Sequence, residues 1–227
     1  TQTWTTGAAL TVTGSTTVTG STIIQGAFAF TTGSLALSGG NFTTTATAAT
    51  AFTNNGATTI TTGTLTAQAS TSSKTFTGLI TLNGGTMTGN CATLVLGAGL
   101  TNTSGTVTLT GTATLSTLNG AITANAATAI ANLTFNTVAA FTISGSNTLT
   151  VSGTLTSTSP AVVTNTGTVT VTTSIAGTGA FTNDANSTLN YAGTSIVPTL
   201  TASANPNTVN YNGAAQTVKA TATYHHL

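Results

Sequence analysis

Val-Thr-Val-Thr at residues 169–172 is the kind of stretch that decides the fold, because apolar and hydroxyl side chains alternate with a period of two. This period places successive side chains on opposite faces of a β-strand. The same alternation recurs at residues 10–13, 107–110 and 149–152, each time followed by a turn or corner and one further apolar residue. Thr, Val, Ile and Phe all suit the pleated surface of a strand. The chain is therefore predicted to be all-β and built from a recurring short unit.

Short strands repeated at the length of one coil turn indicate a β-solenoid. A looser repeat, apolar-Thr-Asn followed by a polar turn, occurs at residues 52–54, 100–102, 163–165 and 181–183. Its spacings of about 48, 63 and 18 residues fit two, three and one turns of a coil with roughly 18–24 residues per turn. At about 4.8 Å per turn, roughly 11 turns would make a rod about 50 Å long. We expect residues 1–227 to form one elongated domain of this type.

Two other architectures compete with the solenoid. A β-sandwich would also show many short alternating strands, but its core, about 10 Å thick, needs more than one or two apolar side chains per strand. The Ala-rich residues 123–131 could form a helix, yet they lack a charged cap and an apolar stripe with helical spacing. The solenoid is therefore preferred, and the sandwich is kept as the alternative.

The alternation also predicts which side chains fill the coil. Apolar residues expected to stack inward are Val12, Leu37, Ile60, Leu82, Leu96, Leu109, Phe135, Ile143, Val151, Val171 and Leu189. Outward threonines would form ladders, while each turn pairs its backbone with the turns above and below. Asn-Gly pairs at residues 55–56, 83–84, 119–120 and 212–213 are predicted to supply turns with positive φ.

Composition excludes several classes of function. Of 227 residues, 65 are Thr and 25 are Gly, while Lys74, Lys219 and Asp184 are the only charged side chains. Two Lys cannot neutralise enough phosphates for nucleic-acid binding, and no apolar run approaches the roughly 18 residues of a membrane span. We therefore expect no nucleic-acid partner and no membrane insertion. Stability should barely change with salt, or between about pH 4 and 9, because there is little charge to screen or titrate.

Catalytic and metal chemistry are not expected either. A carboxylate pair needs two acids, and Asp184 is alone and sits in an Asn-Asp-Ala-Asn turn signature. Adjacent His225 and His226 would point to opposite faces of a strand and could not easily share a metal. The single cysteine, Cys91, permits no internal disulfide and is interpreted as a small buried side chain. We expect no enzyme activity, no cofactor and no metal site.

The C-terminal stretch carries a more specific signal. Residues 207–220 are Asn-Thr-Val-Asn-Tyr-Asn-Gly-Ala-Ala-Gln-Thr-Val-Lys-Ala, and residues 224–227 are Tyr-His-His-Leu. This resembles a motif of the secreted bacterial surface proteins called β-strand-repeat proteins, in which N-T-V-x-Y-N-G-x-x-Q-T-V leads to Y-x-x-L and then to T-L-S-G and further strands. The match covers the last tenth of the chain, whereas the Thr/Gly/Asn-rich composition covers all of it. The resemblance implies an extracellular location and a role as an adhesin or structural filament.

The two ends of the chain look like parts of one continuing pattern. The family motif would run on beyond Leu227, and residues 1–14 are similar to the strand that would come next. The start carries no Met and no basic and apolar leader, so we expect it to be processed or excised. Copies stacked head to tail, or tandem repeats of one long chain, would follow. The candidate residues of the subunit or repeat junction are Trp4, Leu10, Tyr211, Tyr224 and Leu227.

Three functions fit this interpretation. The preferred one is a structural, extracellular subunit or repeat unit of a surface filament assembled end to end, with copies of itself as partners. The second is an adhesin that binds polysaccharide or another cell surface, which an exposed aromatic cluster on one face would favour. The third is ice binding by outward Thr-x-Thr arrays, and the uneven spacings of about 48, 63 and 18 residues argue against it.

Overall fold

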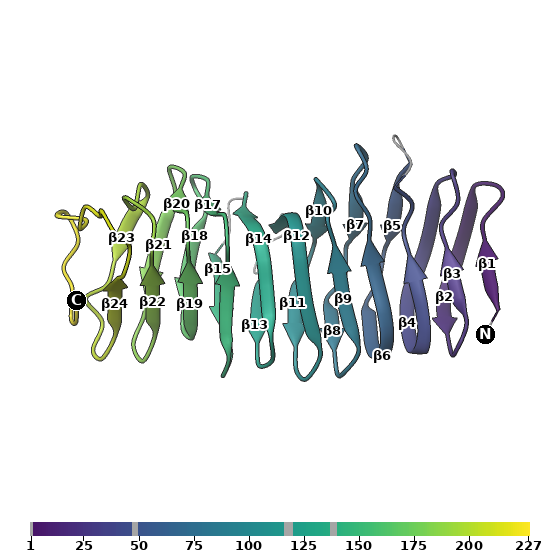
Figure 1. Ribbon diagram of the computed structural model, residues 1–227, viewed down its shortest axis with the longest axis horizontal. Helices are drawn as coiled ribbons and strands as arrows, with labels where there is room; N and C mark the ends of the chain where they lie inside the picture. The colour runs from purple at the N-terminus through teal and green to yellow at the C-terminus, as the bar shows by residue number, and fades with distance from the viewer. Residues whose placement is uncertain (1, 47–49, 116–119, 137–139) are drawn as a thin grey trace.

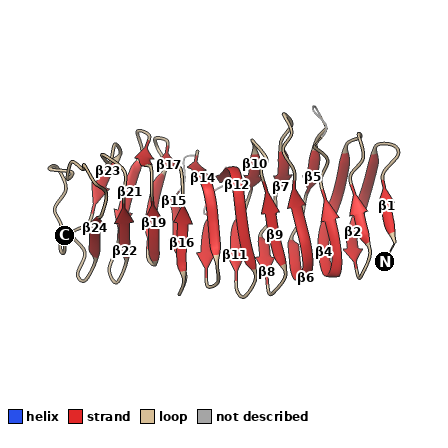
Figure 2. Cartoon of the chain, in the orientation of Figure 1, coloured by secondary structure: helices blue, strands red, loops and turns tan. Residues whose placement is uncertain are grey.

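The chain forms an elongated coil of parallel strands. The computed structural model describes residues 2–46, 50–115, 120–136 and 140–227. These residues form strands and no helix, and each pairing between strands is parallel (Figure 2). Successive turns stack from the N-terminus at one end to the C-terminus at the other (Figure 1). The β-solenoid prediction is confirmed, with about 10 turns instead of about 11, and the sandwich alternative is wrong.

Strand pairing divides the coil into three faces, here called A, B and C. Face A contains β1 (Thr3–Thr5), β3 (Thr22–Ile24), β9 (Thr86–Gly89), β16 (Thr148–Val151), β19 (Thr168–Val171), β22 (Thr188–Tyr191), β24 (Thr208–Tyr211) and parts of the long strands β4 (Phe30–Thr43), β6 (Thr58–Ala67), β12 (Thr106–Leu115) and β14 (Thr128–Phe135). Face B contains β5 (Phe52–Asn54), β7 (Lys74–Phe76), β10 (Leu94–Leu96), β17 (Thr154–Ser157), β20 (Ser174–Ala176) and parts of β2 (Leu10–Val18), β4, β12 and β14. Face C contains β8 (Ile80–Leu82), β11 (Gly99–Asn102), β13 (Ala121–Ala124), β15 (Ala140–Ser144), β18 (Val162–Asn165), β21 (Ala180–Asn183), β23 (Thr199–Thr201) and parts of β2, β4 and β6.

One turn of the coil takes 18 to 23 residues. Trp4 is aligned with Ile23 and Ile23 with Phe42, which is 19 residues each time, whereas the next step to Leu65 takes 23. The extra residues lie in the corners, where long strands pass from one face to the next and the register shifts. At one corner Gly63 has φ +88°, and a Cβ there would collide with the carbonyl of Gly40 on the preceding turn. Glycine therefore permits the close stacking of turns at this corner.

The predicted turn glycines are only partly confirmed. Gly84 has positive φ as expected, but Gly56 and Gly213 do not, so for these two the prediction is wrong. Gly120 also has no positive φ, and its partner at position 119 lies outside the described residues. The turn at Gly56 is held differently, because the buried amide of Asn54 donates to the Gly56 carbonyl at 2.9 Å. A side-chain hydrogen bond replaces the left-handed glycine there.

The apolar-Thr-Asn repeat maps onto two faces instead of one. Residues 100–102, 163–165 and 181–183 lie on face C, and the 18-residue spacing between the last two is one whole turn, as predicted. Leu100 is aligned through Ile122 and Ile143 with Asn165, so the 63-residue spacing misses three turns by two residues and that part of the prediction is wrong. Residues 52–54 lie on face B, so the 48-residue spacing is not a whole number of turns and that part of the prediction is wrong. Residues 123–131 fall in β13, β14 and the corner between them, which excludes the helix alternative.

A single apolar core runs along the inside of the coil. Each predicted inward residue from Leu37 to Leu189 is buried, while Val12 is half-buried because the first turn has a neighbour on one side only. Aromatic rings stack between turns, with Phe52 touching Phe30, Phe42 and Phe76 at centroid distances of 5.1–5.8 Å. The inward residues of the last turn, Leu200, Ala202 and Val209, are buried as well, so the core is covered at the C-terminal end and exposed at the N-terminal end.

Candidate functional site

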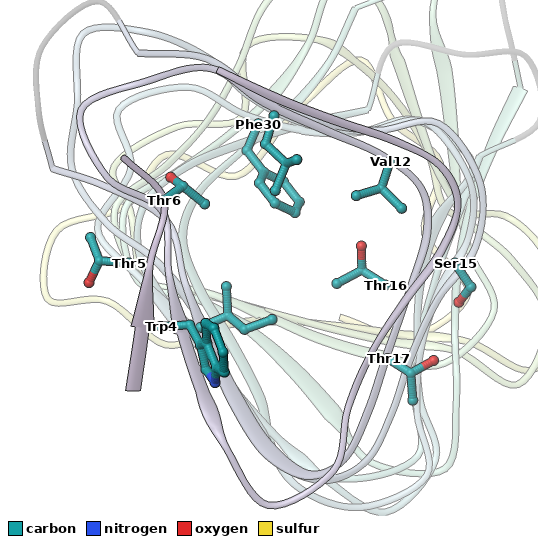
Figure 3. A pocket seen from close by; sticks show the side chains of 10 residues that line it. Trp4, Thr5, Thr6, Val12, Ser15, Thr16, Thr17 and Phe30 are labelled. Atoms are coloured by element: carbon teal, nitrogen blue, oxygen red, sulfur yellow. The ribbon is translucent and has the colours of Figure 1, made fainter. Parts of the chain in front are cut away.

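The N-terminal end of the coil is open. Trp4 is 63% exposed and Leu10 is 40% exposed, although both stand in inward columns, aligned with Ile23 and Phe30 of the next turn. Figure 3 shows Trp4, Val12 and Phe30 pointing into the hollow that these turns enclose. The hollow measures about 520 Å³ and its lining carries no charged side chain. This end is therefore an uncharged, largely apolar mouth ringed by strands that pair on one side.

The C-terminal end is partly covered by its own chain. The backbone N–H of Val209 donates to His226 O at 3.1 Å, and that of His225 donates to Ala202 O at 3.0 Å. Beneath this segment the hydroxyls of Tyr211 and Tyr224 are 2.8 Å apart, and the two rings meet edge to face. Burial, reinforced by the Tyr211 hydroxyl, raises the pKa of Tyr224 well above its usual value, so this hydroxyl stays protonated and available for its hydrogen bonds.

The five predicted junction residues divide between the two ends. Trp4 and Leu10 lie at the open mouth, whereas Tyr211, Tyr224 and Leu227 lie at the opposite end, where Leu227 is 65% exposed. They do not meet within one chain. They could meet only across a contact between neighbouring copies or repeats, so the junction stays a prediction.

The outward side of face A carries a regular ladder of hydroxyl groups, which we call the threonine face. Among the described residues its first column is Thr3, Thr22, Asn41, Thr64, Thr86, Thr106, Ala127, Thr148, Thr168, Thr188 and Thr208, and its second is Thr5, Ile24, Thr43, Thr66, Thr88, Thr108, Ala129, Thr150, Thr170, Asn190 and Asn210. The two columns keep the same register from turn to turn. The sequence argument from uneven spacing is therefore wrong for this face, because the spacing was measured on a repeat that lies on faces B and C.

Lys74 is a buried charged residue that the sequence argument missed. Its side chain is fully buried in the inward column of face B between Phe52 and Leu94. The Nζ donates to the carbonyl of Thr50 at 2.7 Å. Burial lowers the pKa of Lys74, and the nearby Cys91 opposes this in part. The alternation in Lys-Thr-Phe at 74–76 was the available signal, since it puts Lys74 on the same side as Phe76.

The remaining polar candidates behave mostly as the sequence predicted. Cys91 is buried and its Sγ lies 3.1 Å from Thr93 O. Asp184 caps a turn by accepting from the Ala185 N–H at 2.8 Å. The rings of His225 and His226 lie 4.2 Å apart, so the prediction that they point to opposite faces is wrong; the chain bends there instead of continuing as a strand. Within the described ranges no group of three or more His, Cys, Asp or Glu side chains gathers to hold a metal ion.

Exposed aromatic side chains are few in the part of the chain that the structure describes. Its exposed large aromatic side chains are Trp4 at the mouth and Phe28 in a loop, and they do not form the lateral cluster that would favour the adhesin hypothesis. No helix of these residues is long and apolar enough to cross a membrane.

Comparison with models of known protein families, with curated protein sequences and with solved structures returns no significant match. Any assignment of function must therefore be argued from the geometry of the coil.

Proposed function

We propose that this chain is a structural building block of an extracellular surface filament, in which a neighbouring copy continues the coil at the N-terminal mouth. The observation that carries the proposal is the exposure of Trp4 and Leu10, which stand in core columns that no other strand of the described residues extends beyond the first turn. A further turn of the same coil is the occupant that fits both the columns and the strand edges.

The edge of the first turn supports this occupant. β1 pairs with β3 and β2 pairs with β4, each on one side, so nearly a full turn of backbone N–H and C=O groups faces outward along the axis. Unpaired edges of this kind are templates for another strand. A docking turn would also bury the indole of Trp4 and the side chain of Leu10, at about 1.5–3 kcal/mol for each fully buried apolar side chain.

The resulting contact would build a fibre. The mouth presents Trp4 and Leu10, while the other end presents Leu227 and the segment over Tyr211, so the two surfaces differ and the contact is head to tail. A head-to-tail contact without rotation back to the start does not close into a ring. The near absence of charge, at a formal net charge of +1, leaves little repulsion between copies.

Electron microscopy of native material tests the proposal. Filaments with an axial repeat near 50 Å are expected, which is the rise of about 11 stacked strands at about 4.8 Å each. Isolated rods in native material would overturn it. The mass of the denatured chain then separates stacked copies from tandem repeats of one long chain.

A matched pair of variants locates the contact. Trp4→Glu places a carboxylate in the core column at the mouth and is expected to dissolve the filaments. Thr5→Glu places the same charge one residue further on, on the outward side of the same strand, and is expected to leave them intact. Circular dichroism checks that both variants keep their strands. Filaments that survive Trp4→Glu would contradict the proposal.

A further inference from the structure

The threonine face is the most regular surface of the molecule. Both of its outward positions are threonine on six of the eleven strands of face A, namely 3/5, 64/66, 86/88, 106/108, 148/150 and 168/170. No register shift interrupts the pairing of these outward columns from β9 onward to β24. The central turn carries Thr106 and Thr108, which are both exposed. A surface of this kind presents the same two groups again and again along one straight line.

The repeat distances of the face follow from strand geometry. Neighbouring turns lie about 4.8 Å apart along the rod, and two outward residues on one strand lie about 6.6–6.8 Å apart. The hydroxyls therefore form a nearly rectangular net roughly 50 Å long and two columns wide. Oxygen atoms on the faces of hexagonal ice repeat at comparable distances in two directions.

The chemistry of the net suits water and little else. The hydroxyls of Thr106, Thr108 and Thr148 make no hydrogen bond to protein within the described chain, so they are available to solvent. Their χ1 angles are restricted by β-branching, which holds each methyl and hydroxyl in place before any ligand arrives. Lys74 is buried in the core, Lys219 Nζ donates to Val197 O, and Asp184 lies in the corner between β21 and β22, so none of the three stands in the two outward columns. An ionic mineral surface would need charges that the net lacks.

The other two faces do not repeat this arrangement. On face B the outward column is interrupted by Val95 and Ala176, and on face C by Ala36 and Ala121. Face A has interruptions at Ile24, Ala127 and Ala129, but both of its outward positions are threonine on six strands. At the edge of face C, Thr166 Oγ1 donates to Ile143 O at 3.3 Å and is not free for solvent. On face A of the described chain, Thr88 donates to the hydroxyl of Thr66 at 3.4 Å and Thr170 accepts from the amide of Asn190 at 3.3 Å. Most of the other threonine hydroxyls that the structure describes in its two columns have no protein partner.

We propose that the threonine face binds ice. Waters held by the two hydroxyl columns take up positions of the ice lattice, and the methyl groups between them sit in its surface troughs. The bound rod pins the advancing crystal front and lowers the temperature at which it grows. Because the face runs along the side of the rod, this activity is independent of contacts at the ends.

Thermal hysteresis of the purified full chain is the test. Measurable hysteresis with faceted crystals is expected, and the Thr106→Tyr variant should lose most of it because a bulky ring lifts the centre of the face off the ice. Thr101→Tyr is the matched control, since Thr101 is outward on face C in the same turn, and it should keep full activity. Thermal unfolding of both variants verifies that the coil is intact.

A variant with increased thermal hysteresis provides a second test, because misfolding would not increase the activity. Ala129 interrupts the second column between Thr108 and Thr150, so Ala129→Thr should increase hysteresis. The proposal is overturned by absence of hysteresis in the wild-type chain at high concentration, or by equal loss in Thr106→Tyr and Thr101→Tyr. Depletion by suspended crystalline cellulose but not by ice would equally overturn it, in favour of a carbohydrate ligand.

Discussion

Phe52→Ala should unfold one end of the rod before the other. Phe52 is fully buried in the third turn and packs against three aromatic rings, with centroids 5.8 Å from Phe30, 5.2 Å from Phe42 and 5.1 Å from Phe76. Truncating a buried Phe to Ala costs about 3–5 kcal/mol, and each aromatic pair contributes about 0.5–1.5 kcal/mol beyond its buried area. We therefore expect a loss near the upper end, about 5 kcal/mol.

The chain carries its own probes for locating this loss. The single Trp, Trp4, reports on the N-terminal end, and the three Tyr residues report on the C-terminal end, where Tyr191, Tyr211 and Tyr224 pack together. Because each turn of a solenoid contacts only its neighbours, denaturant should shift the tryptophan transition of Phe52→Ala strongly and the tyrosine transition much less.

The control for this experiment is Phe28→Ala, since Phe28 is 44% exposed and its loss should change stability by no more than about 0.5 kcal/mol. A cost below about 1 kcal/mol for Phe52→Ala would refute the aromatic packing. Equal shifts of the tryptophan and tyrosine signals would refute the nearest-neighbour argument.

Three further outcomes are expected from thermal unfolding. Burial holds the pKa of Lys74 below its usual 10.5, so the unfolded chain binds more protons than the folded chain between the folded pKa and 10.5. Stability should therefore rise with pH in that window. Lys74→Met should be more stable at neutral pH and lose this rise, whereas the control Lys219→Met should keep it. Gly63→Ala should lower the free energy of unfolding by at least about 1–2 kcal/mol for the left-handed backbone alone. The control Gly14→Ala, at a position with ordinary φ and open space, should be neutral or slightly stabilising. Equal losses of stability in the two variants would contradict the argument about the corner at Gly63. Raising the salt concentration to about 1 M should leave Tm almost unchanged, and a fall of many degrees would show that charge matters.

Strand formation and the direction of side chains followed from the sequence because period-two alternation is a local signal. Leu82, Leu109 and Val151 were placed inside the coil by alternation alone, and all three are buried. The same rule places Lys74 inside, where a charged side chain is costly. The structure meets this cost with a carbonyl partner at Thr50 and a lowered pKa.

The assignment of strands to faces was harder to predict from the sequence than strand formation. Corner lengths vary, so a turn takes 19 residues at one place and 23 at another, and a fixed period loses register within a few turns. The unit at residues 52–54 was assigned to the wrong column for this reason. Thr-x-Thr at 64–66, 86–88 and 106–108 was the better marker of one face, because those strands pair directly.

The parallel stacking of turns has a mechanical consequence. In the coil each turn of about 20 residues adds only about 4.8 Å of length, but the same residues pulled straight span about 70 Å. A rod pulled along its axis would release one turn at a time as the hydrogen bonds between neighbouring turns break. Each released turn would then span more than ten times the length that it occupies in the coil. The coil would thus absorb mechanical work by unfolding turn by turn under tension, and would refold when the load is removed.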